Sequence, residues 1–110
     1  MAMISEPRTD DDELTRAQVD ALPGATVLEF GTQWCGYCRA VAPAFRAQLQ
    51  RHPGVRHLEI EDGQGKPLGR SFGVKLWPTF VFLVDGKEVA RLVRPRDAAS
   101  IRDAFGKLGV

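Results

Sequence analysis

The sequence predicts a single α/β domain in which a central mixed β-sheet is covered by helices on both faces. Strand-like segments alternate with segments of helical periodicity along the first part of the chain, which is the order that produces parallel strands. An Asp85-Gly86 hairpin signal then joins two strand-like segments, so part of the sheet should be antiparallel. The chain has 110 residues, 44% of them hydrophobic, which is enough for one compact core.

The N-terminal part of the sequence divides into a tail and the start of the domain. Residues 1–13 contain an acidic run, and we expect them to form a flexible, solvated tail, with the domain spanning residues 14–110. Thr15 and Gln18 fit a capping box, which predicts a short helix over residues 16–22 before a Pro-Gly break.

The next two elements should form the centre of the domain. A near-continuous apolar run over residues 26–31 is typical of a strand that is covered on both faces. Apolar residues then recur at every fourth position from Val41 to Leu49, which predicts a helix over residues 36–51 with one buried stripe. Pro43 lies inside this helix and should bend its axis.

Five further elements complete the expected domain. Alternating apolar residues predict a strand over residues 55–61. Pro67, which suits the first position of a helix, predicts a short helix over residues 67–72. The strongest strand pattern covers residues 79–84, and the Asp-Gly turn that follows it predicts an antiparallel strand over residues 87–93. The last helix should begin after Asp97, a good N-cap.

The composition favours neither a nucleic-acid-binding protein nor a membrane protein. The 15 basic and 14 acidic residues give a formal net charge of +1. No run approaches the roughly 20 apolar residues of a membrane span, and the first residues lack the basic and apolar regions of a signal peptide. We therefore expect a cytoplasmic protein, and we expect it to be a monomer.

The chemistry should lie in Trp34-Cys35-Gly36-Tyr37-Cys38, which contains both cysteines of the chain. Two thiols three positions apart on the first turn of a helix can close a disulfide and so form a reversible two-electron couple. The first cysteine would lie where unpaired helix N–H groups and the helix dipole lower a thiol pKa, so Cys35 is the expected nucleophile. This chemistry requires no metal and no other cofactor.

Taken together, these patterns make the sequence resemble the thioredoxin family from Thr15 to Leu108. The residues that carry the resemblance are Trp34-Cys35-Gly36-x-Cys38, Pro43, and Gly73-Val74-x-x-x-Pro78-Thr79 leading into a strand that ends at Asp85-Gly86. The resemblance implies the thioredoxin fold. It also implies a thiol–disulfide oxidoreductase that reduces or exchanges disulfides in protein substrates and contributes to cell redox homeostasis.

The same resemblance assigns roles to individual residues. Cys35 would attack a substrate disulfide, and Cys38, which should be the more buried, would resolve the mixed disulfide. Pro78 matches the cis-proline of the family, beside which the backbone of Trp77 would pair with an extended substrate. The implied substrate-binding residues are Trp34, Gly36, Tyr37, Trp77 and Pro78. The implied electron donor is an NADPH-dependent flavoprotein reductase.

Glu29 falls where the family carries a buried acid beneath the cysteines. An unpaired carboxylate there should hold its proton to higher pH than a free glutamate, because burial disfavours the charged form. It would then serve as the general base for Cys38. The alternative is an edge-strand glutamate that faces water.

Other positions depart from the family pattern and concern substrate choice. Tyr37 replaces a proline that is common in thioredoxins, so we expect a less reducing couple. Lys75, Arg94 and Arg96 would add positive charge to the substrate-facing surface, which suggests a partner with acidic flanks. The alternative for these three residues is a solvated rim.

Three other functions remain open from the sequence. Cys35, Cys38, His52 and His57 approximate the spacing of a zinc finger, although a Pro-Gly break separates the histidines and His57 fits the polar face of a strand. The chain could also be an adapter that keeps the fold but makes little use of its cysteines. A glutathione-linked, glutaredoxin-like reductase is the third alternative.

Overall fold

The computed structural model describes residues 4–7, 14–32 and 35–110. Within these residues five strands form one sheet in the order β1-β3-β2-β4-β5. The elements are β1 (Ile4–Pro7), α1 (Arg16–Asp20), β2 (Ala25–Gly31), α2 (Gly36–Arg51), β3 (Arg56–Glu61), α3 (Pro67–Ser71), β4 (Thr79–Val84), β5 (Lys87–Val93) and α4 (Ala98–Gly106). No helix in the described part of the chain is long and apolar enough to cross a membrane.

The sheet is mixed, as the sequence predicted. Strand β2 runs parallel to β3 and antiparallel to β4, and β4 pairs antiparallel with β5 across the Asp85-Gly86 turn. Thr15 and Gln18 form the expected capping box at α1, although the helix ends at Asp20 and is shorter than predicted.

The N-terminal segment differs from the sequence prediction. Residues 4–7 form strand β1, which pairs in parallel with β3 at the edge of the sheet, so the expectation of a tail over residues 1–13 is wrong for these four positions. Residues 1–3 and 8–13 lie outside the described residues, and the domain boundary at residue 14 stays a prediction for them.

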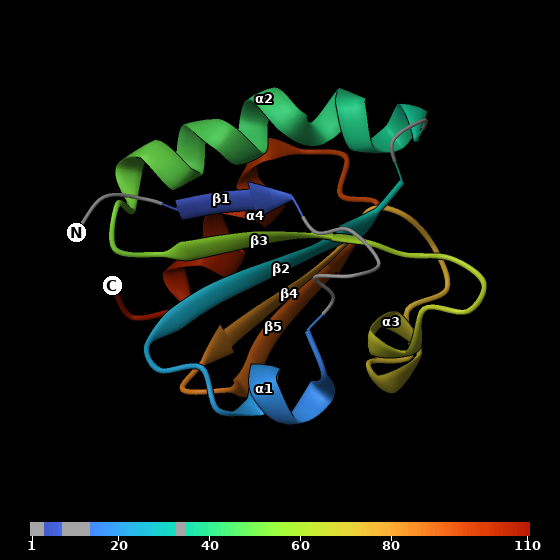
Figure 1. Ribbon diagram of the computed structural model, residues 1–110. Helices are drawn as coiled ribbons and strands as arrows, with labels where there is room; N and C mark the ends of the chain where they lie inside the picture. The colour runs from blue at the N-terminus through green and yellow to red at the C-terminus, as the bar shows by residue number, and fades with distance from the viewer. Residues whose placement is uncertain (1–3, 8–13, 33–34) are drawn as a thin grey trace.

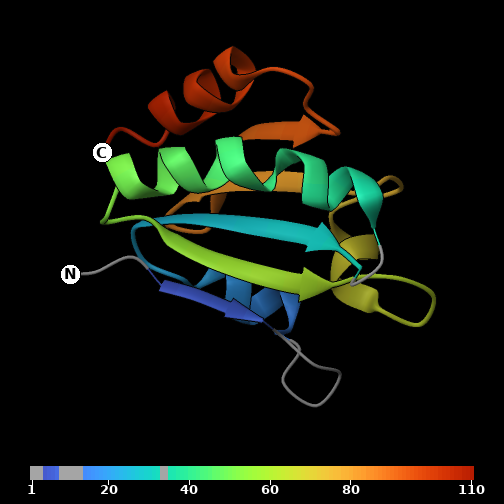
Figure 2. The same ribbon diagram turned by 90° about the horizontal axis from the view of Figure 1, so that it is seen from above.

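Two helices cover each face of the sheet (Figures 1 and 2). On one face, α2 and α4 pack on β2 and β4; on the other, α1 and α3 pack on β2, β3 and β4. Successive side chains of β2 point to opposite faces of the sheet, and both faces are apolar. Val27 packs with the buried residues of α2 and α4, whereas Leu28 and Phe30 pack with those of α1 and α3. Glu29 therefore lies on the face that α2 covers.

An aromatic cluster fixes the position of α2 over the sheet. Phe45 is 2% exposed, stacks on Phe80 of β4 at a ring-centroid distance of 4.5 Å and packs against Phe105 of α4 at 5.5 Å. Burying such a side chain contributes about 2–3 kcal/mol. The cluster holds the N-terminus of α2 near the C-terminal end of β2. The two cysteines lie at this end of the sheet, because α2 follows β2 in the chain.

Candidate active site

The two cysteines lie on the first turn of α2. Cys35 is the N-cap residue, and its Sγ accepts a hydrogen bond of 3.1 Å from the backbone N–H of Cys38. The two residues form a disulfide with their Cα atoms 5.2 Å apart, within the usual range for such bonds. Both cysteines are partly exposed. The expectation that Cys38 is the more buried of the two stays a prediction.

Gly31, the last residue of β2, leaves room for the second sulfur. A Cβ at this position would come within 2.8 Å of the Cys38 Sγ. Nothing in the sequence pattern indicates this close approach of Gly31 to Cys38.

The loop before β4 contains a cis peptide bond between Trp77 and Pro78, which confirms the sequence prediction of a cis-proline. The indole Nε1 of Trp77 donates to Asp62 Oδ2 at 2.8 Å, and the backbone N–H of Asp62 donates to the Gly31 carbonyl at 2.9 Å. Asp62 therefore ties the Trp77 side chain to the end of β2. Asp62 was not among the site residues predicted from the sequence.

Arg94 links the cis-proline loop to the cysteine motif. Its Nε donates to the carbonyl of Trp77 at 2.9 Å, and its guanidinium lies over the Tyr37 ring with the Cζ 4.4 Å from the ring centroid. Tyr37 is 55% exposed, and Gly36 beside it is also exposed, whereas Pro78 is buried. Trp34, the remaining predicted contact residue, lies outside the described residues.

Glu29 has a partner, contrary to the expectation of an unpaired carboxylate. Its Oε1 lies 2.7 Å from Nε2 of His57, and the two side chains are 17% and 4% exposed, respectively. Glu29 is not on an edge strand either, because β2 lies between β3 and β4. The placement of His57 on a polar face is wrong, since its ring packs edge-on against Phe45 at 4.8 Å.

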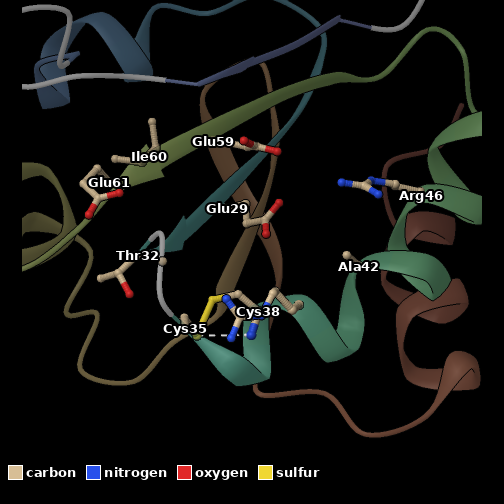
Figure 3. Close-up of a pocket in the computed structure, with 11 residues that line it drawn as sticks. Glu29, Thr32, Cys35, Cys38, Ala42, Arg46, Glu59, Ile60 and Glu61 are labelled. Atoms are coloured by element: carbon tan, nitrogen blue, oxygen red, sulfur yellow. Dashed lines mark hydrogen bonds between the residues drawn. A yellow bond between two sulfur atoms is a disulfide. The ribbon is translucent and has the colours of Figure 1, made fainter.

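Glu29 and the cysteines line one hollow of about 370 Å³ between the sheet and α2 (Figure 3). Glu59 occupies the position beside Glu29 on β3, and Arg46 of α2 points toward both carboxylates from the opposite wall. The hollow is therefore lined by three carboxylates and two guanidinium groups as well as by Cys38, around a space that water can enter; the charged residues are Glu29, Glu59, Glu61, Arg39 and Arg46.

The structure also bears on metal binding. Glu29, His57 and Glu59 offer ligand atoms within 4.8 Å of one another, a set that suits a divalent cation. The zinc-finger set is not assembled, because His52 caps the far end of α2, about 20 Å along the helix from Cys38. Nδ1 of His52 lies 3.0 Å from the Val110 carbonyl oxygen.

A redox-active cysteine pair at the start of a helix that follows the central strand, in a chain that also has a cis-proline, defines the class of thiol–disulfide oxidoreductases. The comparisons with known proteins agree with this class. The Thioredoxin family model matches residues 9–107. The chain belongs to the thioredoxin family, as the sequence resemblance indicated, and it is a thiol–disulfide oxidoreductase.

Individual relatives show how far the similarity extends. Thioredoxin H-type of Oryza sativa subsp. indica is 30% identical over 86 residues, which are 78% of this chain and 69% of that protein. Thioredoxin H-type 1 of Nicotiana tabacum is 39% identical over 67 residues, or 61% of this chain and 53% of the relative. The chain thus spans between half and about two thirds of these two proteins.

Solved structures confirm the thioredoxin fold. Thioredoxin 2 from Pseudomonas aeruginosa PAO1, solved in its reduced form, superposes with a TM-score of 0.79 at 52% identity, covering 88% of this chain and 91% of that one. A thioredoxin from Nicotiana alata superposes with a TM-score of 0.74 at 25% identity, covering 96% and 91%.

Proposed function

We propose that this chain reduces disulfides in protein substrates by cycling Cys35 and Cys38 between dithiol and disulfide. The Cys35 thiolate attacks a substrate sulfur, forms a mixed disulfide and releases one substrate thiolate. Cys38 then loses its proton and attacks the Cys35 sulfur, which releases the second substrate thiolate. Two electrons and two protons pass to the substrate, and the Cys35–Cys38 disulfide remains.

The hydrogen bond from the Cys38 N–H to the Cys35 sulfur supports this assignment. In the disulfide form this N–H, at the positive end of α2, already points at the atom that must carry the thiolate charge after reduction. Charge-assisted hydrogen bonds of this kind lower the pKa of a thiol. Cys35 is therefore the attacking residue, and Cys38 is the resolving residue.

Glu29 is the proposed proton acceptor for Cys38, and His57 is the residue that holds it in place. Both Glu29 and Cys38 line the hollow of Figure 3, through which a proton can pass directly or by way of water. Glu29→Gln should therefore slow the resolving step, whereas Glu59→Gln removes the neighbouring carboxylate and should leave that step nearly unchanged. Equal effects of the two substitutions would contradict the role of Glu29.

The proposed substrate surface surrounds the cysteines. Trp34, Gly36 and Tyr37 come from the cysteine motif, and the backbone of Trp77 beside Pro78 is the proposed pairing edge for an extended substrate. Exposed apolar groups lie on the same segments: Tyr37 is 55% exposed and Leu76 46% exposed. An apolar surface of this kind suits contact with unfolded or extended protein segments.

The remaining parts of the proposal concern partners and location. The proposed electron donor is an NADPH-dependent flavoprotein reductase, and the reaction uses the cysteine pair in place of a bound cofactor. The protein is proposed to act as a monomer in the cytoplasm without nucleic acid or membrane. Some relatives are named chloroplastic, so fractionation of cells that express this protein is the test of its compartment.

Insulin reduction with dithiothreitol as electron donor tests the proposal. The parent protein should accelerate the reaction, and Cys35→Ser should abolish the acceleration. Activity that depends on glutathione and glutathione reductase would indicate the glutaredoxin-like alternative. No acceleration by the correctly folded parent would indicate an adapter.

A further inference from the structure

Arg94 contacts two segments of the proposed substrate surface, the cis-proline loop and the dipeptide between the cysteines. It follows β5, and its backbone N–H donates to the carbonyl of Pro78 at 2.9 Å. Its side chain then reaches back across the loop, where Nε binds the carbonyl of Trp77 and the guanidinium covers the Tyr37 ring. Arg94 therefore contacts both the cis-proline loop and the dipeptide between the cysteines.

We propose that Arg94 is a specificity-determining residue that selects protein substrates with a carboxylate beside the disulfide they present to Cys35. This inference rests on the proposed function and names its substrate class. A peptide that lies against both Tyr37 and Trp77 also lies against the guanidinium, which contacts both of these residues. An Asp or Glu next to the substrate cysteine matches the planar donor groups of arginine.

The donors of Arg94 are available for such a contact. A guanidinium carries five N–H donors, and the hydrogen bond to Trp77 uses the one on Nε. Among the described residues no carboxylate forms an ion pair with Arg94, although Arg16, Arg91 and Arg102 each have one. The terminal NH₂ groups thus keep their capacity for a carboxylate from outside the chain.

Asp97 lines the same groove as Arg94 and Tyr37 and is the one acidic residue among its described lining residues. Its Oδ1 accepts the backbone N–H of Ser100 at 2.7 Å, and it forms no ion pair with Arg94. Arg94 is also held in place, because the Trp77 carbonyl fixes Nε and the Tyr37 ring supports the guanidinium plane. A fixed guanidinium loses less conformational entropy when it binds a carboxylate than a free surface arginine does.

Two disulfide-bonded peptides that differ by one residue test this inference. Both carry the same sequence around an intramolecular disulfide, with Glu beside the first cysteine in one and Gln in the other. The pre-reduced protein is mixed with excess peptide at low ionic strength, and the second-order rate of thiol release is measured. The parent should reduce the Glu peptide about 10-fold faster, which corresponds to about 1.4 kcal/mol.

Arg94→Gln should abolish the preference, so that the Glu and Gln peptides are reduced at equal rates. Arg102→Gln is the matched control, because it removes the same charge from an exposed position on α4, where the side chain is 63% exposed, and it should keep the preference. Arg94→Lys keeps the positive charge but lacks the planar pair of guanidinium donors, so it should retain part of the preference.

Three results would overturn the inference. They are the absence of a preference in the parent, an equal loss on both peptides in Arg94→Gln, and an equal loss of preference in Arg102→Gln. An equal loss on both peptides would mean that Arg94 only supports the local structure. An equal loss of preference in Arg102→Gln would mean that the preference depends on the overall positive charge and not on Arg94. If the parent reduces neither peptide, the proposed function fails as well, so the two failures are distinguishable.

Discussion

The pair of Glu29 and His57 gives a quantitative prediction for stability. His57→Leu removes the hydrogen bond to Glu29 but keeps an apolar side chain of similar size against Phe45. The bond joins Nε2 and Oε1 at 2.7 Å, and the two side chains are only 4% and 17% exposed. Hydrogen bonds to charged groups contribute about 1.5–3 kcal/mol, so the substitution should lower the free energy of unfolding by about 2 kcal/mol.

The double substitution separates the pair from every other effect of losing His57. His57→Leu leaves the Glu29 carboxylate without its donor, whereas His57→Leu with Glu29→Leu removes both polar partners. Replacing both partners by apolar groups is far less costly than removing one. The double variant should therefore be at least about 1 kcal/mol more stable than the sum of the two single losses implies.

Urea denaturation of the oxidised proteins at pH 7, followed by tryptophan fluorescence, gives the four free energies of this cycle. A coupling energy below about 0.5 kcal/mol, the usual limit of additivity, would refute the reasoning. In that case the contact between Glu29 and His57 would not contribute to stability, and the proposed positioning of Glu29 by His57 would lose its basis.

Three further predictions concern the cysteines, the cis-proline loop and the last helix. Cys38→Ser should accumulate a mixed disulfide with substrate on a non-reducing gel, because the resolving sulfur is gone, and Cys35→Ser should accumulate none. Asp62→Ala leaves the Trp77 indole N–H without its 2.8 Å partner and should destabilise the oxidised protein by about 1–2 kcal/mol in urea denaturation; unchanged stability would argue against this anchor. The hydrogen bond from Ser100 lowers the pKa of Asp97 from its ordinary 3.8, so Asp97 stabilises the fold above that pH and loses its contribution as the pH falls through the lower folded value. Thermal melts should therefore show a deficit for Asp97→Ala at pH 7 that shrinks below pH 3.8, and a constant deficit would contradict the cap.

The elements that surround the site were predictable because their signals are local. Helix α2 has the bounds that the four-residue spacing of its apolar stripe indicated, and β4 and β5 flank the Asp-Gly turn that specifies a hairpin. The fold class and the family followed from the same patterns. Strand β1 was missed because four residues without apolar alternation carry no strand signal, and its pairing with β3 joins distant parts of the chain.

The partner of Glu29 was missed for a different reason. Leu58 and Ile60 are apolar and lie on one face of β3, which predicted that the opposite face, with His57, is exposed to water. In the structure β3 lies inside the sheet and α2 covers that other face, so His57 is buried beside Glu29. The signal that could have found this contact is the parallel register, in which Val27 pairs with His57 and Glu29 with Glu59.

The contacts of Arg94 leave no comparable signal in the sequence. The residue adopts a φ of 48°, a left-handed conformation that favours glycine, and its long side chain reaches two segments far from it along the chain. Neither feature follows from periodicity or from a turn motif. Charge alone suggested a role at this position, and only the structure shows which groups the guanidinium contacts.

Alkylation of Cys35 as a function of pH tests the central claim most directly. Reduced Cys38→Ala protein leaves a single thiol, and the backbone N–H of residue 38 that binds the Cys35 sulfur is retained. The rate of reaction with iodoacetamide should rise with a midpoint near pH 7, because the helix N-terminus and this N–H stabilise the thiolate. A midpoint near pH 8.5, the value of an ordinary thiol, would contradict the proposed mechanism.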